Sequence, residues 1–147
     1  MSTIKVDTYL TRGGASEIAI DKLKGVSSAG SMLVVGEGGT NTTNLQQGLA
    51  KCWAQIEGNI TSYRDSFNTS SLTDVSTGRP RVTYTNNMSN DDASLTMAHQ
   101  YSSASGSGAF FANVGARNTA YHEHNHYENG SLTDGEAYND SVHGDLA

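Results

Sequence analysis

Three histidines at alternate positions, His122, His124 and His126, lie in the stretch AYHEHNHYENG of a chain that has only five histidines. On a β-strand, alternate side chains face the same side about 6.5 to 7 Å apart, so two neighbouring imidazoles can bind one metal ion while the third lies too far along. One chain therefore offers an incomplete site. Near a three-fold axis, two histidines from each of three chains would supply about six nitrogens, which suits Fe, Ni or a related transition metal such as Zn.

Two other interpretations of these histidines stay open. Glu123, Asn125 and Glu128 beside them are typical of a wet surface, so the segment also fits a solvent-facing strand or loop. A pH-responsive contact is the third interpretation, in which protonated imidazoles meet Glu123, Glu128 or a neighbouring chain. The lone histidines His99 and His143 are each expected to be structural residues.

Motifs for enzymatic chemistry are scarce. The sequence contains no GxSxG, no P-loop, no HExxH and no paired cysteine motif. Asp91 and Asp92 are adjacent and would point to opposite faces of a strand, so they do not make the carboxylate pair that cleaves glycosidic bonds. We therefore expect no catalytic residues and a protein that is not an enzyme.

The composition favours short strands joined by turns. Of 147 residues, 35% are hydrophobic, 16 are glycine and one is proline. Such a chain fits one compact domain, or a smaller domain with an extended arm, and disfavours a helical bundle with a large leucine core. Cys52 is the single cysteine, so no disulfide can form within the chain, and we expect a small buried residue there.

Charge is distributed unevenly. Residues 1–51 hold five Lys or Arg against four Asp or Glu, a net charge of +1, whereas residues 52–147 hold four against eleven, a net charge of −7. The second part would repel phosphates, so we expect no nucleic-acid partner. No apolar run approaches the roughly 20 residues that span a bilayer, and the N-terminal stretch lacks the apolar core of a signal peptide, so we expect neither membrane insertion nor export.

Residues 1–50 are expected to form an extended arm. TIKVDTYLTR has the period of two that is typical of a half-buried strand, and MLVV is a short apolar run between spacers rich in glycine and threonine. These short runs cannot form a core alone, so the arm must pack on the following domain, on copies of itself or on another protein. The expected contact residues are Ile4, Val6, Leu10, Leu33, Val34 and Val35.

One short helix is expected where the arm meets the next domain. Residues 44–56, NLQQGLAKCWAQI, have apolar residues at helical spacings, with Asn44 as a plausible N-cap and Gly48 as a weak point. The run could equally change to a strand at CWAQIEG. In that case Cys52 and Trp53 would open the core of the following domain.

Residues 51–147 are expected to form a mainly β head domain, an antiparallel β-sandwich that is jelly-roll-like, or a barrel. The second part of the chain alternates short strand patterns with turns rich in Gly, Asn, Asp and Ser. The alternation places Val82 and Tyr84 on one face of their strand, and Leu95, Met97 and His99 on one face of theirs. The expected strands are residues 60–68, 72–77, 80–86, 93–101, 108–116, 118–128 and 138–146.

Three blocks of sequence occur in a characteristic order: LAKCWAQIEG, RDSFNTSSLTDVSTGRPRVTYTNNMSN and the terminal VHGDLA. This combination resembles a domain of tail-fibre and other virion proteins of marine bacteriophages that infect cyanobacteria and ocean heterotrophs, and STIKVDT is similar to the opening of many such proteins. The resemblance covers about residues 45–100 and the last six residues. It does not extend to residues 14–44 or 101–137, which include the three alternating histidines.

The resemblance implies a non-enzymatic virion structural protein, made in the host cytoplasm and placed on the exterior of the particle as a homotrimer. It implies attachment to other virion proteins through the N-terminal arm and contact with a host-surface glycan or outer-membrane protein at a fibre tip. His-x-His segments of this kind are similar to those that bind iron along the axis of some phage fibre tips. In the shared block we expect Phe67 to point inward and Arg64 and Asp65 to form a charged pair at a strand end.

Aromatic side chains are the expected glycan contacts, because sugar rings stack on aromatic faces when these lie in exposed loops. The candidates are Tyr101, Tyr121 and Tyr127. Since the chain has no fibre shaft, a short fibre or fibre-tip module fits its length best. Two alternatives remain: a head or tail decoration protein without receptor binding, and a fragment of a polysaccharide-degrading tailspike.

Overall fold

The computed structural model describes residues 32–36, 39–100 and 110–145 of the chain. It is mainly β, with 62% strand and 4% helix, and its antiparallel sheets pack together as a β-sandwich, which confirms the predicted fold class. The predictions for Ile4, Val6, Leu10 and Tyr101 lie outside the described residues. Among the described residues, none of the helices is long and apolar enough to cross a membrane.

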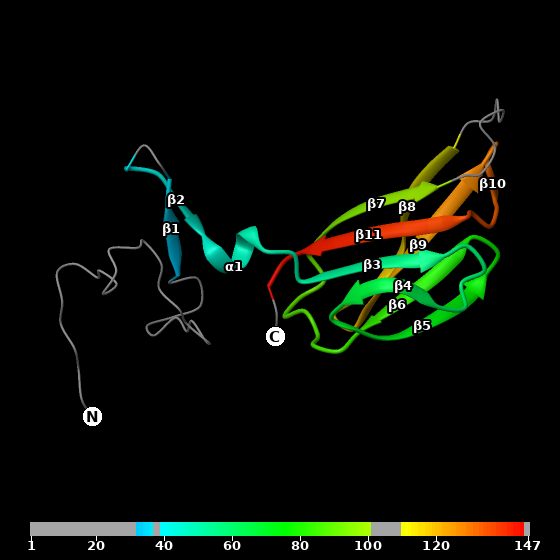
Figure 1. Ribbon diagram of the computed structural model, residues 1–147, viewed down its shortest axis with the longest axis horizontal. Helices are drawn as coiled ribbons and strands as arrows, with labels where there is room; N and C mark the ends of the chain where they lie inside the picture. The colour runs from blue at the N-terminus through cyan, green and yellow to red at the C-terminus, as the bar shows by residue number, and fades with distance from the viewer. Residues whose placement is uncertain (1–31, 37–38, 101–109, 146–147) are drawn as a thin grey trace, which may run out of the picture.

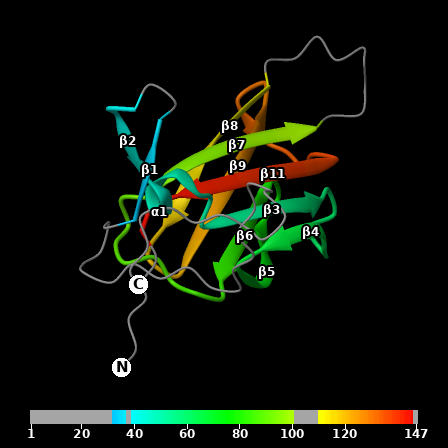
Figure 2. The same cartoon turned by 60° about the vertical axis from the view of Figure 1, so that its left-hand side comes forward.

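The sandwich has two layers (Figures 1 and 2). The first sheet has the strand order β4-β3-β11-β7, and the second has the order β5-β6-β9, with β8 and the short β10 also paired to β9. The first sheet comprises β3 (Cys52–Glu57), β4 (Tyr63–Phe67), β7 (Ser94–Gln100) and β11 (Ala137–His143). The second comprises β5 (Thr69–Ser76), β6 (Arg79–Tyr84), β8 (Phe110–Arg117), β9 (Tyr121–Glu128) and β10 (Ser131–Leu132).

The core lies between the two sheets, and side chains alternate inward and outward along each strand. Apolar inward residues come from β3, β6 and β11, and the expected inward positions of Val82 and Tyr84 are confirmed. Leu95, Met97 and His99 alternate with exposed neighbours on the edge strand β7, also as expected. The buried apolar cluster is Cys52, Ala54, Ile56, Ile60, Val82, Tyr84, Met88, Ala93, Tyr138 and Val142.

Cys52 is fully buried, as predicted. Burial, together with the charge of Asp140, raises the pKa of its thiol to about 12. The thiolate is therefore not populated near neutral pH, and Cys52 acts as a small core residue.

The chain crosses from the first sheet to the second at Asn68, between β4 and β5. Asn68 has a positive φ of 59°, a conformation that Asn tolerates better than most residues. Its side-chain amide donates to the backbone oxygens of Lys51 and Asn86, and its side-chain oxygen accepts from the backbone N–H of Asn86. These three hydrogen bonds hold the corner at one edge of the sandwich.

The helix is shorter than the helical pattern predicted. α1 spans only Leu45–Gly48, with the Asn44 side chain accepting from the backbone N–H of Gln47 at 3.0 Å as the expected N-cap. From Cys52 the chain is strand, the alternative that the sequence left open, because β3 pairs with β4 on one side and β11 on the other. Pairing on both sides and burial of alternate residues stabilise a strand at Cys52–Glu57 more than the weak helical pattern would stabilise a helix.

Phe67 does not point inward, so that prediction is wrong. It lies opposite Trp53 in the β3–β4 ladder, and directly opposed residues share one face of a sheet. Because Cys52 and Ala54 occupy the inner face of β3, Trp53 and its partner face outward. The Phe67 side chain is accordingly 52% exposed.

A two-stranded hairpin precedes the sandwich. β1 (Leu33–Val35) pairs with β2 (Thr42–Asn44), and α1 follows directly. The hairpin extends beyond the end of the sandwich at which β11 terminates (Figure 1). Leu33, Val34 and Val35 are all exposed there.

Candidate functional site

The three alternating histidines lie on the inner face of β9, in the core of the sandwich. The side chains of His122, His124 and His126 are each 0% exposed. The interpretation of this segment as a wet surface strand is therefore wrong. β9 pairs with β6 and β10 along one edge and with β8 along the other, and its inner face packs against β11.

A buried carboxylate on β11 holds two of the histidines. Asp140 accepts from Nδ1 of His124 at 2.7 Å and from Nε2 of His122 at 3.2 Å, and Nδ1 of His122 lies 3.0 Å from the hydroxyl of Tyr84. Burial alone would raise the pKa of Asp140, but the hydrogen bonds from the two imidazoles together hold this pKa below its ordinary value. The carboxylate therefore stays ionised inside the core and joins the two sheets.

The remaining ring nitrogens are fixed by the same geometry. His124 donates from Nδ1 to Asp140, and His126 donates from Nδ1 to the backbone oxygen of Thr133 at 2.7 Å. Neither Nε2 atom has a hydrogen-bond partner. Burial lowers the pKa of His126, against the opposing hydrogen bond to Thr133, and burial followed by the nearby His126 and His124 lowers the pKa of His99.

The predicted metal site at a three-fold axis does not fit this placement. Such a site requires imidazoles that face another chain, and these face the interior of their own sandwich. Among the residues that the structure describes, no group of three or more His, Cys, Asp or Glu side chains is arranged to hold a metal ion. The arrangement instead joins the two sheets through hydrogen bonds between two imidazoles and one carboxylate.

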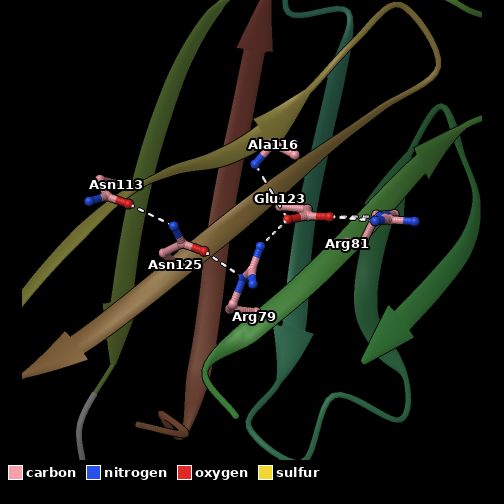
Figure 3. Close-up of polar contacts among 6 residues, drawn as sticks. All are labelled: Arg79, Arg81, Asn113, Ala116, Glu123 and Asn125. Carbon is pink, nitrogen blue, oxygen red and sulfur yellow. Dashed lines mark hydrogen bonds and ion pairs between the residues drawn. The ribbon is translucent and has the colours of Figure 1, made fainter. Parts of the chain in front are cut away.

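The opposite face of β9, on the outside of the sandwich, carries a second network of polar side chains (Figure 3). Glu123 is 1% exposed in its side chain although it lies on the outer face, because Arg79 and Arg81 cover it. Its carboxylate accepts from Nη2 of Arg79 at 2.8 Å, from Nε and Nη2 of Arg81 at 2.9 and 2.6 Å, and from the backbone N–H of Ala116 at 3.3 Å. Burial would raise the pKa of Glu123, but these donors lower it overall, so it is an anion.

Two asparagines extend this network along the strand. Asn125 accepts from Nε of Arg79 at 3.1 Å and donates to the side-chain oxygen of Asn113 at 3.0 Å (Figure 3). We call Arg79, Arg81, Asn113, Glu123 and Asn125 the outer polar row. Its members come from β6, β8 and β9, and each side chain is held by at least one other.

Aromatic rings flank the outer polar row at both ends. At one end, the guanidinium carbon of Arg81 lies 4.3 Å from the ring centroid of Tyr121. At the other end, Tyr127 stacks on Phe111 with centroids 4.6 Å apart, and Phe111 is 45% exposed. Tyr121 and Tyr127 are six residues apart on β9, which corresponds to about 20 Å along the strand.

The outer polar row has donors to spare. A guanidinium carries five N–H groups, and the bonds described use two on Arg79 and two on Arg81, which leaves three on each. Both arginine side chains are about one-third exposed, at 32% and 34%. The row therefore presents oriented hydrogen-bond donors between two aromatic surfaces.

The structure thus places two of the three predicted glycan contacts, Tyr121 and Tyr127, on one face of the second sheet, at opposite ends of the outer polar row. Sequence reasoning missed the arginines between them. The signal was present in RPRVTY, where Arg79 and Arg81 alternate with Pro80 and Val82 and so must share the outer face.

Comparisons of the chain with protein-family models, with curated proteins and with solved structures find no match.

Proposed function

We propose that this chain is a non-enzymatic phage virion protein, a short fibre or fibre-tip module, that attaches to a glycan of the host surface. The resemblance of its sequence blocks to marine phage fibre proteins supports the phage assignment. The binding surface is the outer face of the second sheet, around β9. The observation that carries the proposal is the outer polar row with Tyr121 at one end and Tyr127 on Phe111 at the other.

The chemistry of this face fits a sugar chain. A pyranose has apolar C–H faces that stack on aromatic rings and a rim of hydroxyl groups that accept from N–H donors. The outer polar row supplies such donors from Arg79, Arg81 and Asn125, already oriented by Glu123 and Asn113. Because these side chains are fixed before a ligand arrives, less conformational entropy is lost on binding.

The two buried carboxylates support a binding role over hydrolysis. Glu123 is engaged by Arg79 and Arg81, and Asp140 is enclosed between His122 and His124. A glycosidase needs two carboxyl groups that face one bound sugar, and these two lie on opposite sides of the second sheet. Glu123 and Asp140 therefore do not form the carboxyl pair of a polysaccharide-degrading tailspike, which stays an alternative.

The hairpin β1–β2 is proposed to take part in virion attachment or trimer contact. Leu33, Val34 and Val35 are exposed in the single chain, and an apolar strand of this kind is stabilised by burial against a partner. We propose a homotrimer on the particle exterior, held by this hairpin and by the rest of residues 1–50.

The same exposed strand would also suit a head or tail decoration protein, which is the second candidate. That candidate needs an anchor and does not need a glycan-binding face. The two functions therefore differ in whether the outer face of the second sheet binds sugar.

The test is the binding of purified protein to an array of bacterial surface polysaccharides. We expect the Phe111→Ala/Tyr127→Ala double variant to lose roughly five- to a hundredfold in affinity, taking about 0.5–1.5 kcal/mol for each stacked aromatic ring. Trp53→Ala is the matched control, because Trp53 is an exposed aromatic on the outer face of the other sheet. Absence of binding to any polysaccharide, or equal losses in both variants, would contradict the proposed function.

A further inference from the structure

We infer that the outer face of the second sheet selects acidic glycans, with Arg79 and Arg81 binding a carboxylate or sulfate group on the sugar. This inference rests on the proposed function, since it names the class of glycan that the same face would bind. It depends on the charge, exposure and fixed orientation of the two arginines.

The outer polar row has surplus positive charge in an otherwise acidic part of the protein. Its two guanidinium groups face one carboxylate, Glu123, which leaves the row with a net charge of +1. Residues 52–147 as a whole carry four arginines against eleven acidic residues. Two of those four arginines therefore lie at alternate positions of one strand, on one face, within reach of one ligand.

Because Glu123 is buried, a ligand on this face would contact the arginines above it. Its side chain is 1% exposed and both of its oxygens already accept hydrogen bonds, whereas the arginine side chains are about one-third exposed. An anion that approaches the face therefore contacts guanidinium groups and not the carboxylate. Glu123 acts as a positioning residue that holds the planes of Arg79 and Arg81.

The unused donors suit a planar or tetrahedral anion. Guanidinium groups bind carboxylate and sulfate oxygens through paired N–H donors, and such charge-assisted bonds are stronger than bonds to neutral hydroxyls. Each arginine retains three N–H groups that the internal bonds do not use. The guanidinium of Arg81 also lies over the ring of Tyr121, a cation–π contact.

Two threonines share this face with the arginines. Thr73 on β5 lies opposite Arg81, and Thr83 lies opposite Tyr121, so both residues belong to the arginine end of this face. The net charge of the protein does not prevent binding, because at physiological ionic strength charges more than about 8 Å away are largely screened. The local surplus at the row therefore decides the preference.

The experiment compares polygalacturonate with its carboxyl-reduced, neutral counterpart and with a sulfated galactan, using the full chain in a binding assay at several salt concentrations. We expect at least tenfold tighter binding of the acidic polymers than of the neutral one, with a difference that shrinks as salt rises. This comparison uses the unaltered protein and does not depend on any variant's ability to fold.

Variants then locate the effect. Arg81→Gln removes one positive charge and brings the net charge of the row to zero, so most of the preference should disappear, whereas Arg64→Gln on exposed β4 removes an arginine from the other sheet and should change nothing. Equal binding of acidic and neutral polymers would overturn the inference and leave glycan binding intact. No binding to any polysaccharide in the wider array would overturn the proposed function itself.

Discussion

Nδ1 of His124 on β9 lies 2.7 Å from Oδ1 of Asp140 on β11, so a hydrogen bond between two buried side chains joins the two sheets of the sandwich. The other oxygen of Asp140 receives a bond from His122. Contacts between the two sheets of a sandwich are usually apolar. Here, hydrogen bonds between one carboxylate and two imidazoles replace part of this apolar packing. Predictions about stability follow from this contact.

Replacing Asp140 should destabilise the fold. In Asp140→Asn the amide N–H group would face an imidazole N–H, so at least one buried donor loses its acceptor, at a cost of about 1–3 kcal/mol. Urea unfolding measures the change. Asp92→Asn is the matched control, because Asp92 is exposed, and its stability should stay close to that of the wild type. An Asp140→Asn protein as stable as the control would contradict the structural role of the carboxylate.

Stability should fall as the pH falls below about 6.5. The pKa values of His99 and His126 are lowered from the ordinary 6.5, so the unfolded chain binds protons that the folded chain does not, and each such histidine contributes a slope of up to about 1.4 kcal/mol per pH unit. The contribution is fully present above pH 6.5. The pKa of Asp140 is likewise lowered from 3.8, so its contribution is present above that value and is lost in stronger acid.

The pH effect can be assigned with one substitution. His126→Asn keeps a donor for the backbone oxygen of Thr133 and removes the titrating ring, so thermal unfolding between pH 8 and 5 should depend less on pH than in the wild type. Thr96→Asn, a substitution of an exposed residue on β7 without a titrating side chain, serves as the control and should retain the wild-type profile. Identical pH profiles for His126→Asn and the wild type would contradict the assignment.

Gly115→Ala should disturb the outer polar row. A Cβ atom at this position would lie 2.7 Å from the side-chain oxygen of Asn125, so that side chain must move, and 3.0 Å from Cβ of Glu123, which is tighter than most Cβ contacts. We expect a loss of about 1–3 kcal/mol in the free energy of unfolding and weaker glycan binding. Gly48→Ala is the control, because its nearest contact would be 3.8 Å from Thr43. Unchanged stability and binding in Gly115→Ala would show that the row is not held as described.

Metal removal should have no effect on stability. Since the three alternating histidines face the interior of one chain, neither a chelator nor added Zn or Ni should shift the melting temperature or the oligomeric state. Differential scanning calorimetry and sedimentation, with and without chelator, measure both. A metal-dependent rise in melting temperature that is absent from His124→Ala would revive a metal site at these residues.

The sequence predicted which side chains share a face but not which face is inside. Period-two alternation correctly grouped His122, His124 and His126, and it correctly opposed them to Glu123 and Asn125. Both sets are polar, so hydrophobicity could not tell the inner set from the outer one. The histidine face lies inside because Asp140, 16 residues beyond His124 in the sequence, supplies a buried hydrogen-bond acceptor for it.

Long-range pairing explains the other differences. The end of α1 and the exposure of Phe67 both depend on β3 lying between β4 and β11, a contact between residues about 85 positions apart in the chain. The outer polar row likewise joins Arg79 to Glu123 across 44 positions. Local patterns predicted the β-sandwich class, whereas these non-local contacts created the candidate site.

The most direct test of the account is to map the glycan contact on the protein by NMR, titrating an isotope-labelled sample with an oligosaccharide of an acidic polymer. If the outer face binds the sugar, chemical shifts should change first at the side chains of Arg79, Arg81, Asn113 and Asn125 and at backbone amides around Tyr121 and Tyr127. The signals of Trp53 and Phe67 on the other sheet should stay unchanged. Shifts confined to that other sheet, or no shifts at saturating sugar, would contradict a glycan-binding outer face.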